Sequence, residues 1–128
     1  MTNRPQLLEQ HDELCDRAFN LMQRKNHDYA ADADALKNLR QCEQLGLCSV
    51  ETGILVRITD KMSRMRQFIE SGILQVEDES IDDTIIDIIN YSVLLRACIH
   101  EKRRACAGPT ADSAVESKPR ETHLPADL

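Results

Sequence analysis

The chain has 128 residues, the size of a single domain, and its 41% hydrophobic and 30% charged residues are the balance of an ordinary soluble protein. Its formal net charge of −6 argues against non-specific binding to the phosphates of nucleic acids. With only four glycines, four prolines and 3% aromatic residues, it lacks the frequent turns of a β-sandwich, so we expect an all-α fold.

The cysteines and the N-terminus point to a cytoplasmic protein. The chain has five widely spaced cysteines without a C-x-x-C pair, which makes a zinc site or a disulfide framework a poor interpretation: Cys15, Cys42, Cys48, Cys98 and Cys106. Reduced thiols in a cytoplasm suit them better. The N-terminal MTNRPQ does not look like a signal peptide. No uncharged apolar run approaches the roughly 18 residues of a membrane span, so we expect no membrane partner.

The first half of the chain predicts one long helix followed by a less regular segment. Pro5 suits the start of a helix, and leucines at heptad spacing predict an amphipathic helix from about 6 to 25. Residues 26–48 suggest short helices, and Gly46 is a plausible helix stop.

A clearer helix is predicted from about 50 to 70, with Ser49 in the N-cap region and Ser71-Gly72 at its end. Apolar residues recur every three or four positions and predict one buried stripe: Ile54, Ile58, Met62, Met65 and Ile69. The opposite side of this helix is predicted to carry Arg57, Asp60, Lys61 and Arg64.

The last predicted helix begins after Ser80, a good N-cap, with Asp83 at the capping-box position. Its apolar residues, from Ile81 to Ile99, cover nearly the whole circumference, which is typical of a central helix. Three of the four prolines follow it. We therefore predict a folded domain over residues 1–106 and a disordered tail over 107–128.

The acids of the last helix are the main candidates for chemistry. Asp83 and Asp87 lie one turn apart, and Asn90 and Tyr91 extend the same face. That face becomes apolar further on, so the aspartates are predicted to point into a cleft between helices. Carboxylates converging there would raise each other's pKa unless a cation were present. Hard oxygen ligands select Mg²⁺, with Mn²⁺ as the alternative.

Non-functional interpretations stand beside this one. Asp83 could be only a capping residue, and Glu79 could be an acid favoured by the helix N-terminus. For Asp87, between two isoleucines, the best structural explanation is a salt bridge to Arg57 or Arg64.

The charged stripe of the 50–70 helix has two interpretations as well. It could be a solvated face with weak ion pairs. Packed against the last helix, it could instead supply Asp60 as a metal ligand and cations for phosphates. Periodicity does not choose between the two.

Four segments together resemble a known family, over about residues 20–100. The segments are KNHDYA, LKNLRQCEQLG, GILVRITDKMSRM and ESIDDTIIDIINYSVLL. In this order and spacing they resemble a small bacterial and phage family labelled nucleotide-modification-associated, which looks like a branch of the MazG-type all-α NTP pyrophosphohydrolases.

This resemblance implies a MazG-like helical bundle that hydrolyses nucleoside triphosphates, often deoxy forms, to monophosphate and pyrophosphate. It implies a homodimer or homotetramer, located in the host cytoplasm if the chain is phage-encoded. The implied metal ligands are Asp60, Glu79, Asp83 and Asp87. Lys61, Arg57 and Arg64 would contact phosphates, Asn90 and Tyr91 the sugar or base, and Asp28 and Asn38 would complete the site.

Two functions from different classes follow. The first is an enzyme in which Mg²⁺ and the acids, with Glu79 as general base, split the α–β bond while Lys61 and the arginines stabilise charge. The second is a protein on the same scaffold that sequesters a nucleotide without turnover. It is favoured by a departure from the superfamily pattern, because the first helix offers R-x-x-D (Arg57, Asp60) where E-x-x-E is usual.

Overall fold

The structure, a computed structural model, describes residues 1–28, 34, 36–72 and 80–108, without the side chains of residues 26–28. The described helices are α1 (Arg4–Asp28), the 3₁₀ helix η1 (Lys37–Arg40), α2 (Gln41–Gln44), α3 (Val50–Ser71) and α4 (Ile81–Ala107). No strand occurs in these ranges, so the predicted all-α fold is confirmed. None of the described helices is long and apolar enough to cross a membrane.

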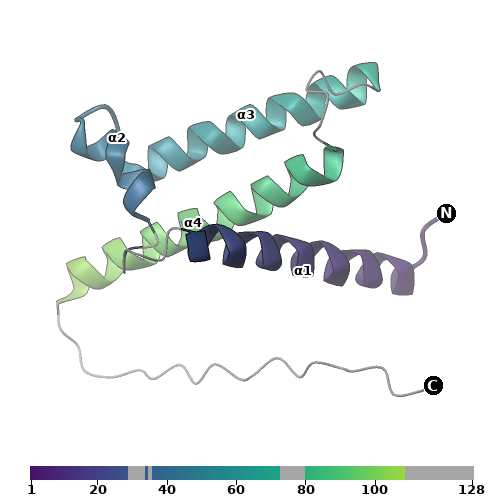
Figure 1. The fold of residues 1–128 in the computed structure, drawn as a ribbon, viewed down its shortest axis with the longest axis horizontal. Helices are drawn as coiled ribbons and strands as arrows, with labels where there is room; N and C mark the ends of the chain where they lie inside the picture. The colour runs from purple at the N-terminus through teal and green to yellow at the C-terminus, as the bar shows by residue number, and fades with distance from the viewer. Residues whose placement is uncertain (29–33, 35, 73–79, 109–128) are drawn as a thin grey trace.

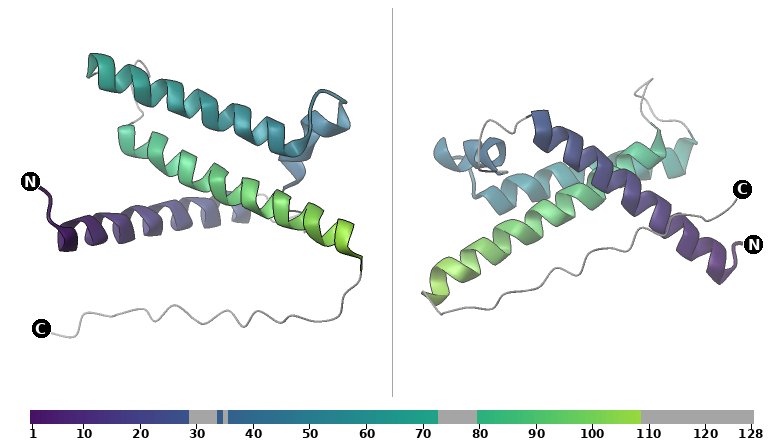
Figure 2. Two further views of the ribbon diagram at one scale, coloured as in Figure 1. Left: turned by 180° about the vertical axis from the view of Figure 1, so that it is seen from behind. Right: turned by 60° about the horizontal axis from the view of Figure 1, so that its bottom comes forward.

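Helix α4 is the centre of the fold and packs against both α3 and α1 (Figure 1). Helix α3 runs antiparallel to α4, whereas α1 crosses α4 while running in broadly the same direction (Figure 2). This arrangement confirms the prediction, made from its nearly all-round apolar surface, that the last helix is central.

Side-chain caps fix the starts of the two long packed helices. The Ser49 side chain accepts a hydrogen bond from the backbone N–H of Thr52 at 3.2 Å, which caps α3. At the start of α4, Asp83 N donates to Ser80 Oγ at 3.2 Å, and Ser80 N donates to Asp83 Oδ2 at 2.9 Å. This reciprocal pair is a capping box, as the sequence predicted.

The apolar core lies between the first half of α3 and the second half of α4. Its buried cluster comprises Leu36, Val50, Ile54 and Cys98. Partly buried side chains pack around this cluster: Leu39, Ile58, Tyr91, Leu94 and Leu95. Buried side chains also occur outside the cluster, among them Ala18 of α1 and Ile86 of α4. The core is therefore concentrated at one end of the α3–α4 pair.

The predicted buried stripe of α3 is wrong at Met62 and Ile69, which are 56% and 81% exposed, whereas Met65 is half-buried. The reason is geometric: successive steps of four residues advance 40° beyond a full turn, so Met62 lies about 80° around the helix from Ile54. By the same geometry Lys61, seven residues after Ile54, lies only about 20° from it. Lys61 therefore faces α4 and does not share the exposed side that carries Asp60.

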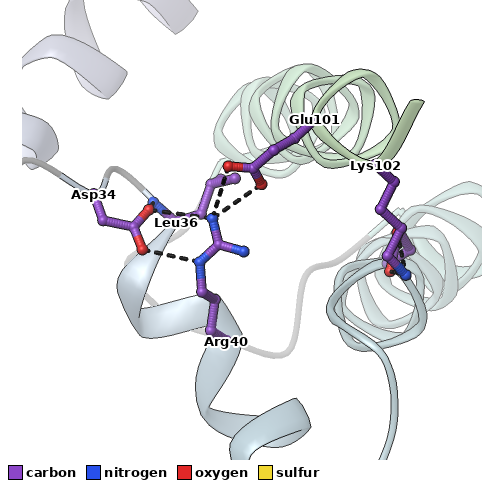
Figure 3. A network of polar contacts seen from close by, with 6 residues as sticks. Asp34, Leu36, Arg40, Glu101 and Lys102 are labelled. Carbon is purple, nitrogen blue, oxygen red and sulfur yellow. Dashed lines mark hydrogen bonds and ion pairs between the residues drawn. The ribbon is translucent and has the colours of Figure 1, made fainter. Parts of the chain in front are cut away.

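An ion-pair network closes the core end of the bundle (Figure 3). Arg40 donates to Asp34 Oδ2 at 2.9 Å and to Glu101 Oε2 at 3.0 Å, so it joins the segment before η1 to α4. Hydrogen bonds from the Arg40 guanidinium and then from the Leu36 backbone N–H lower the pKa of Asp34. Lys102 of α4 pairs with Glu51 of α3 at 2.7 Å. These pairs hold the second half of α4 against η1 and the start of α3.

We expect Ser80→Ala to destabilise the fold, because the change removes both the hydroxyl that accepts from Asp83 N and one donor to the Asp83 carboxylate. A lost N-cap costs about 1 kcal/mol of unfolding free energy, measurable by urea denaturation at pH 7. Ser92→Ala is the matched control, since Ser92 is a mid-helix residue that donates only to the Ile88 carbonyl. Equal effects of the two changes would contradict the capping role.

The same cap predicts a pH dependence. Hydrogen bonds from the Ser80 backbone N–H and hydroxyl lower the pKa of Asp83, so the ionised carboxylate stabilises the folded state. This contribution is present above the unfolded pKa of about 3.9 and is lost as the pH falls through the lower folded value. The stability difference between wild type and Ser80→Ala should therefore shrink below about pH 4.

Candidate functional site

The site is built around Asp87, a carboxylate in the middle of α4. Lys61 Nζ of α3 lies 2.7 Å from Asp87 Oδ2, and Lys25 Nζ of α1 lies 4.0 Å from Asp87 Oδ1. The side chains of Asp87 and Lys61 are only 19% and 13% exposed. Asp87 therefore marks a junction at which charged groups from α1, α3 and α4 meet, and we call it the Asp87 junction.

This arrangement answers the question of what balances Asp87. The sequence suggested a salt bridge to Arg57 or Arg64, but the two cations that the structure places at Asp87 are lysines. Lys61 can reach Asp87 because it faces α4, and Lys25 reaches it from the last turns of α1. The half-buried Asp87 carboxylate is thus compensated by two cations. An anionic ligand could compete with Asp87 for these cations.

A hydroxyl one turn before Asp87 adds a second polar group. Thr84 is fully buried, and its Oγ1 has no hydrogen-bond partner among the described residues. Because residues three apart share a helix face, this hydroxyl lies on the same side of α4 as Asp87. A buried hydroxyl without a partner costs free energy, so it is an unusual feature in a folded interior.

The other acids of the first turns of α4 already have partners. The carboxylate of Asp83 also accepts from Ser80 Oγ at 2.8 Å, so its structural interpretation as a capping residue is confirmed. Asp82 accepts from Arg17 of α1 at 2.9 Å, and this hydrogen bond raises the pKa of Arg17. Both carboxylates are thus engaged in holding the start of α4.

The charged residues of α3 are divided between two sides of the helix. Lys61 faces α4, and Arg64 is half-buried one turn further on. Arg57 and Asp60 are exposed, and Asp60 lies about 100° around the helix from Lys61. The structure therefore brings Lys61 to Asp87 and leaves Asp60 on the outer side.

Three further predicted residues lie at different distances from the junction. Asn90, one turn after Asp87, is half-buried, whereas Tyr91 packs against the apolar core cluster. Asn38 is exposed on η1. Arg40, two residues after Asn38, pairs with Glu101. Glu101 lies about 21 Å along α4 from Asp87. Asn38 thus belongs to the core end of the bundle.

Two predicted residues fall outside what can be described. Glu79, the expected ligand and general base, lies in the undescribed segment before Ser80, and the Asp28 side chain is likewise outside the described part. Among the described side chains, no three His, Cys, Asp or Glu residues are grouped so that they could hold a metal ion.

Two residues of the junction were not among the sequence-based candidates. Lys25 precedes Asp28 by three residues, and only the crossing of α1 over α4 shows that it approaches Asp87. For Thr84 the sequence offered one indication, since it precedes Asp87 by one turn and is followed by two isoleucines.

We expect Lys61→Met to lower the unfolding free energy by about 2 kcal/mol, because it leaves the Asp87 carboxylate half-buried with only the more distant Lys25. Asp87→Asn should also destabilise the fold, because it removes the negative charge that Lys61 contacts at 2.7 Å. The double variant should lose less than the sum of the two single changes, and urea denaturation of all four proteins measures this coupling. Additive losses would show that the two residues act independently.

Comparison with known proteins identifies a family. The family model described as nucleotide modification associated domain 1 matches residues 25–99, more than half of the chain. The matched part runs from Lys25 through η1, α2 and α3 to Ile99 of α4, and so includes Lys61, Thr84 and Asp87. No curated protein and no solved structure matches the chain. The chain belongs to the nucleotide modification associated domain 1 family.

Proposed function

We propose that this chain binds nucleoside triphosphates at the Asp87 junction and, with Mg²⁺, hydrolyses them to monophosphate and pyrophosphate. The observation that carries the proposal is the half-buried Asp87 carboxylate between lysines from two other helices, on the same helix face as a buried hydroxyl without a described partner. Such a reaction would shape the nucleotide pool or supply a monophosphate for modified DNA, in keeping with the family's description.

The lysines support binding of the phosphates. Lys61 and Lys25 reach the junction from different helices, so together they can surround an anionic group. Arg57 and Arg64 lie one turn to either side of Lys61 on α3 and would extend the cationic surface along a triphosphate. A bound phosphate would replace Asp87 as the counter-ion of these cations.

The donor chemistry of the junction also suits Mg²⁺. Mg²⁺ is usually held by one or two protein oxygens together with water and substrate phosphates. The Asp87 carboxylate and the Thr84 hydroxyl are hard oxygen donors on one face of α4, and a metal ligand role would give that hydroxyl a partner. Glu79 is a further candidate from the sequence. When bound, Mg²⁺ would lower the pKa of a coordinated water and polarise the phosphates.

A second function, binding without turnover, is favoured by one observation. Asp83 is engaged by Ser80, and the described residues contain no cluster of three potential metal ligands. A junction with a single available carboxylate could hold a nucleotide through its lysines and still lack the metal site needed for hydrolysis. The chain would then sequester its ligand.

One experiment separates the two functions. Purified protein is incubated with a panel of NTPs and dNTPs and with Mg²⁺ or Mn²⁺, and the products are identified by mass while binding is measured by calorimetry. We expect release of pyrophosphate, and a loss of about 100-fold or more in Asp87→Asn. Asp82→Asn is the matched control, because it breaks an ion pair between α1 and α4 away from the junction. Nucleotide binding without product would establish sequestration, and a fully active Asp87→Asn would contradict the site.

We also propose that the chain forms a homo-oligomer through α3. A second exposed side of α3, different from the side that carries Asp60, has three large apolar residues at heptad spacing. They are Leu55, Met62 and Ile69, which are 54%, 56% and 81% exposed. Leu55 and Ile69 lie equally far on either side of Met62. A two-fold axis at Met62 would therefore place Leu55 of one copy against Ile69 of a second.

Met62→Glu should weaken this assembly, because it would bury two carboxylates against each other at the symmetry axis. Light scattering coupled to gel filtration should show a dimer or tetramer for the wild type and a monomer for the variant. Ser63→Glu is the control, since it adds the same charge at the neighbouring exposed position. A wild-type protein that is monomeric at high concentration would refute the proposal.

A further inference from the structure

The turn between α2 and α3 holds two cysteines close together. Helix α2 ends at Gln44 and is followed by Gly46, whose φ is +71°. Gly46 N donates to Glu43 O at 3.0 Å, and Leu47 N donates to Cys42 O at 2.9 Å. This is the Schellman arrangement, in which the chain folds back over the last helical turn. Cys48 N also points at Cys42 O, at 3.5 Å. That contact limits the two Cα atoms to a separation of about 7 Å.

The sulfur atoms of this pair converge on one point. Gly53, in the first turn of α3, has no side chain, and a Cβ placed there would lie 3.8 Å from Cys48 Sγ and 4.0 Å from Cys42 Sγ. Both thiols therefore sit against the same patch of helix backbone, and both are half-buried. A disulfide needs Cα atoms about 4–7 Å apart and converging side chains. The Cys48 N contact bounds the Cα separation near the upper end of that range, and both sulfurs lie against Gly53.

The remaining described cysteines are placed differently. Cys98 is buried in the core cluster, Cys15 lies on α1 and Cys106 is exposed in the last turn of α4. Cys42 and Cys48 are thus distinguished from the other three by their shared turn. Burial raises the pKa of the Cys48 thiol, and the neighbouring Cys42 sulfur raises it further.

We propose that Cys42 and Cys48 are an oxidation site that forms an intramolecular disulfide on reaction with a peroxide. The Cys42 thiolate attacks one peroxide oxygen, the O–O bond breaks, and Cys42 becomes a sulfenic acid while water or an alcohol leaves. The Cys48 sulfur then attacks the Cys42 sulfur and displaces the hydroxyl group, which leaves as water with the Cys48 proton. Two thiols are oxidised and one peroxide is reduced.

The product links α2 to Cys48, the residue before the Ser49 cap of α3. The disulfide is independent of the proposed nucleotide chemistry, because this turn adjoins the core end of the bundle and not the Asp87 junction. Its formation can therefore be tested whether or not the protein hydrolyses nucleotides.

Tryptic digestion provides a direct test, since residues 41–57 contain both cysteines and no internal lysine or arginine. The folded protein is treated with hydrogen peroxide, quenched with iodoacetamide and digested without reductant. We expect the 41–57 peptide to be unalkylated and about 2 Da lighter than its dithiol form, with the change reversed by dithiothreitol. In the same sample, Cys106 should be alkylated or singly oxidised.

Two controls make the result decisive. Cys106→Ser should leave formation of the disulfide unchanged, whereas Cys48→Ser should leave Cys42 as a sulfenic acid that dimedone traps. The disulfide should also form about tenfold faster in the folded protein than in about 8 M urea, because the turn holds the thiols at a high effective concentration. Equal rates in the two conditions, or a 41–57 peptide that stays dithiol while Cys106 oxidises, would overturn the proposal.

Discussion

The contact between Asp87 and Lys61 constrains how α3 and α4 can pack. Asp87 lies between Ile86 and Ile88 in a helix whose neighbours are mostly apolar, so its charge must meet a cation at the interface. Lys61 supplies that cation at 2.7 Å. Sliding α3 along α4 by one turn would separate the two groups and leave the half-buried Asp87 carboxylate with only the more distant Lys25. The ion pair therefore disfavours alternative registers that a purely apolar contact would tolerate.

A second constraint acts at the other end of the same helix pair. There Lys102 of α4 forms an ion pair with Glu51 of α3. The hydrogen bond from Lys102 is the main cause that lowers the pKa of Glu51. The buried cluster around Ile54 and Cys98 lies at this end. Polar pairs thus bracket an apolar core, and the register of α3 against α4 is specified at two points. The Asp87 junction lies away from this buried cluster along the α3–α4 pair. An anionic ligand could compete there with Asp87 for Lys61 and Lys25.

Most of the local structure could be predicted from the sequence, because the signals for it are local. Ser49, Ser80 and Gly46 each act on backbone groups within a few residues, and all three have the predicted roles. The all-α class and the central position of α4 also follow from periodicity. Helix α1 is longer than the predicted 6–25, and α4 continues to Ala107, because helix ends without a strong stop signal extend beyond the periodic apolar residues.

The errors arose where a side chain's surroundings depend on another helix. The α3 stripe was assigned by spacing alone, and small angular differences accumulated until Lys61 was placed outside and Met62 inside. The partner of Asp87 was sought among arginines of α3, yet its two cations come from two helices. Lys25 could be recognised only after the crossing of α1 and α4 was known. Asp87 thus could be singled out from the sequence, but its partners could not.

Asp83 shows why acids that are close together in the sequence overestimate the number of metal ligands. Its Oδ2 accepts from Ser80 N, which is one half of the capping box, and also from Ser80 Oγ. This oxygen could ligate a metal only by giving up one of these bonds, at the expense of the first turn of α4. The capping role of Asp83 and a ligand role through Oδ2 therefore oppose each other. In contrast, Thr84 and Asp87 lie further inside the helix, where a ligand could engage them without any change to its start.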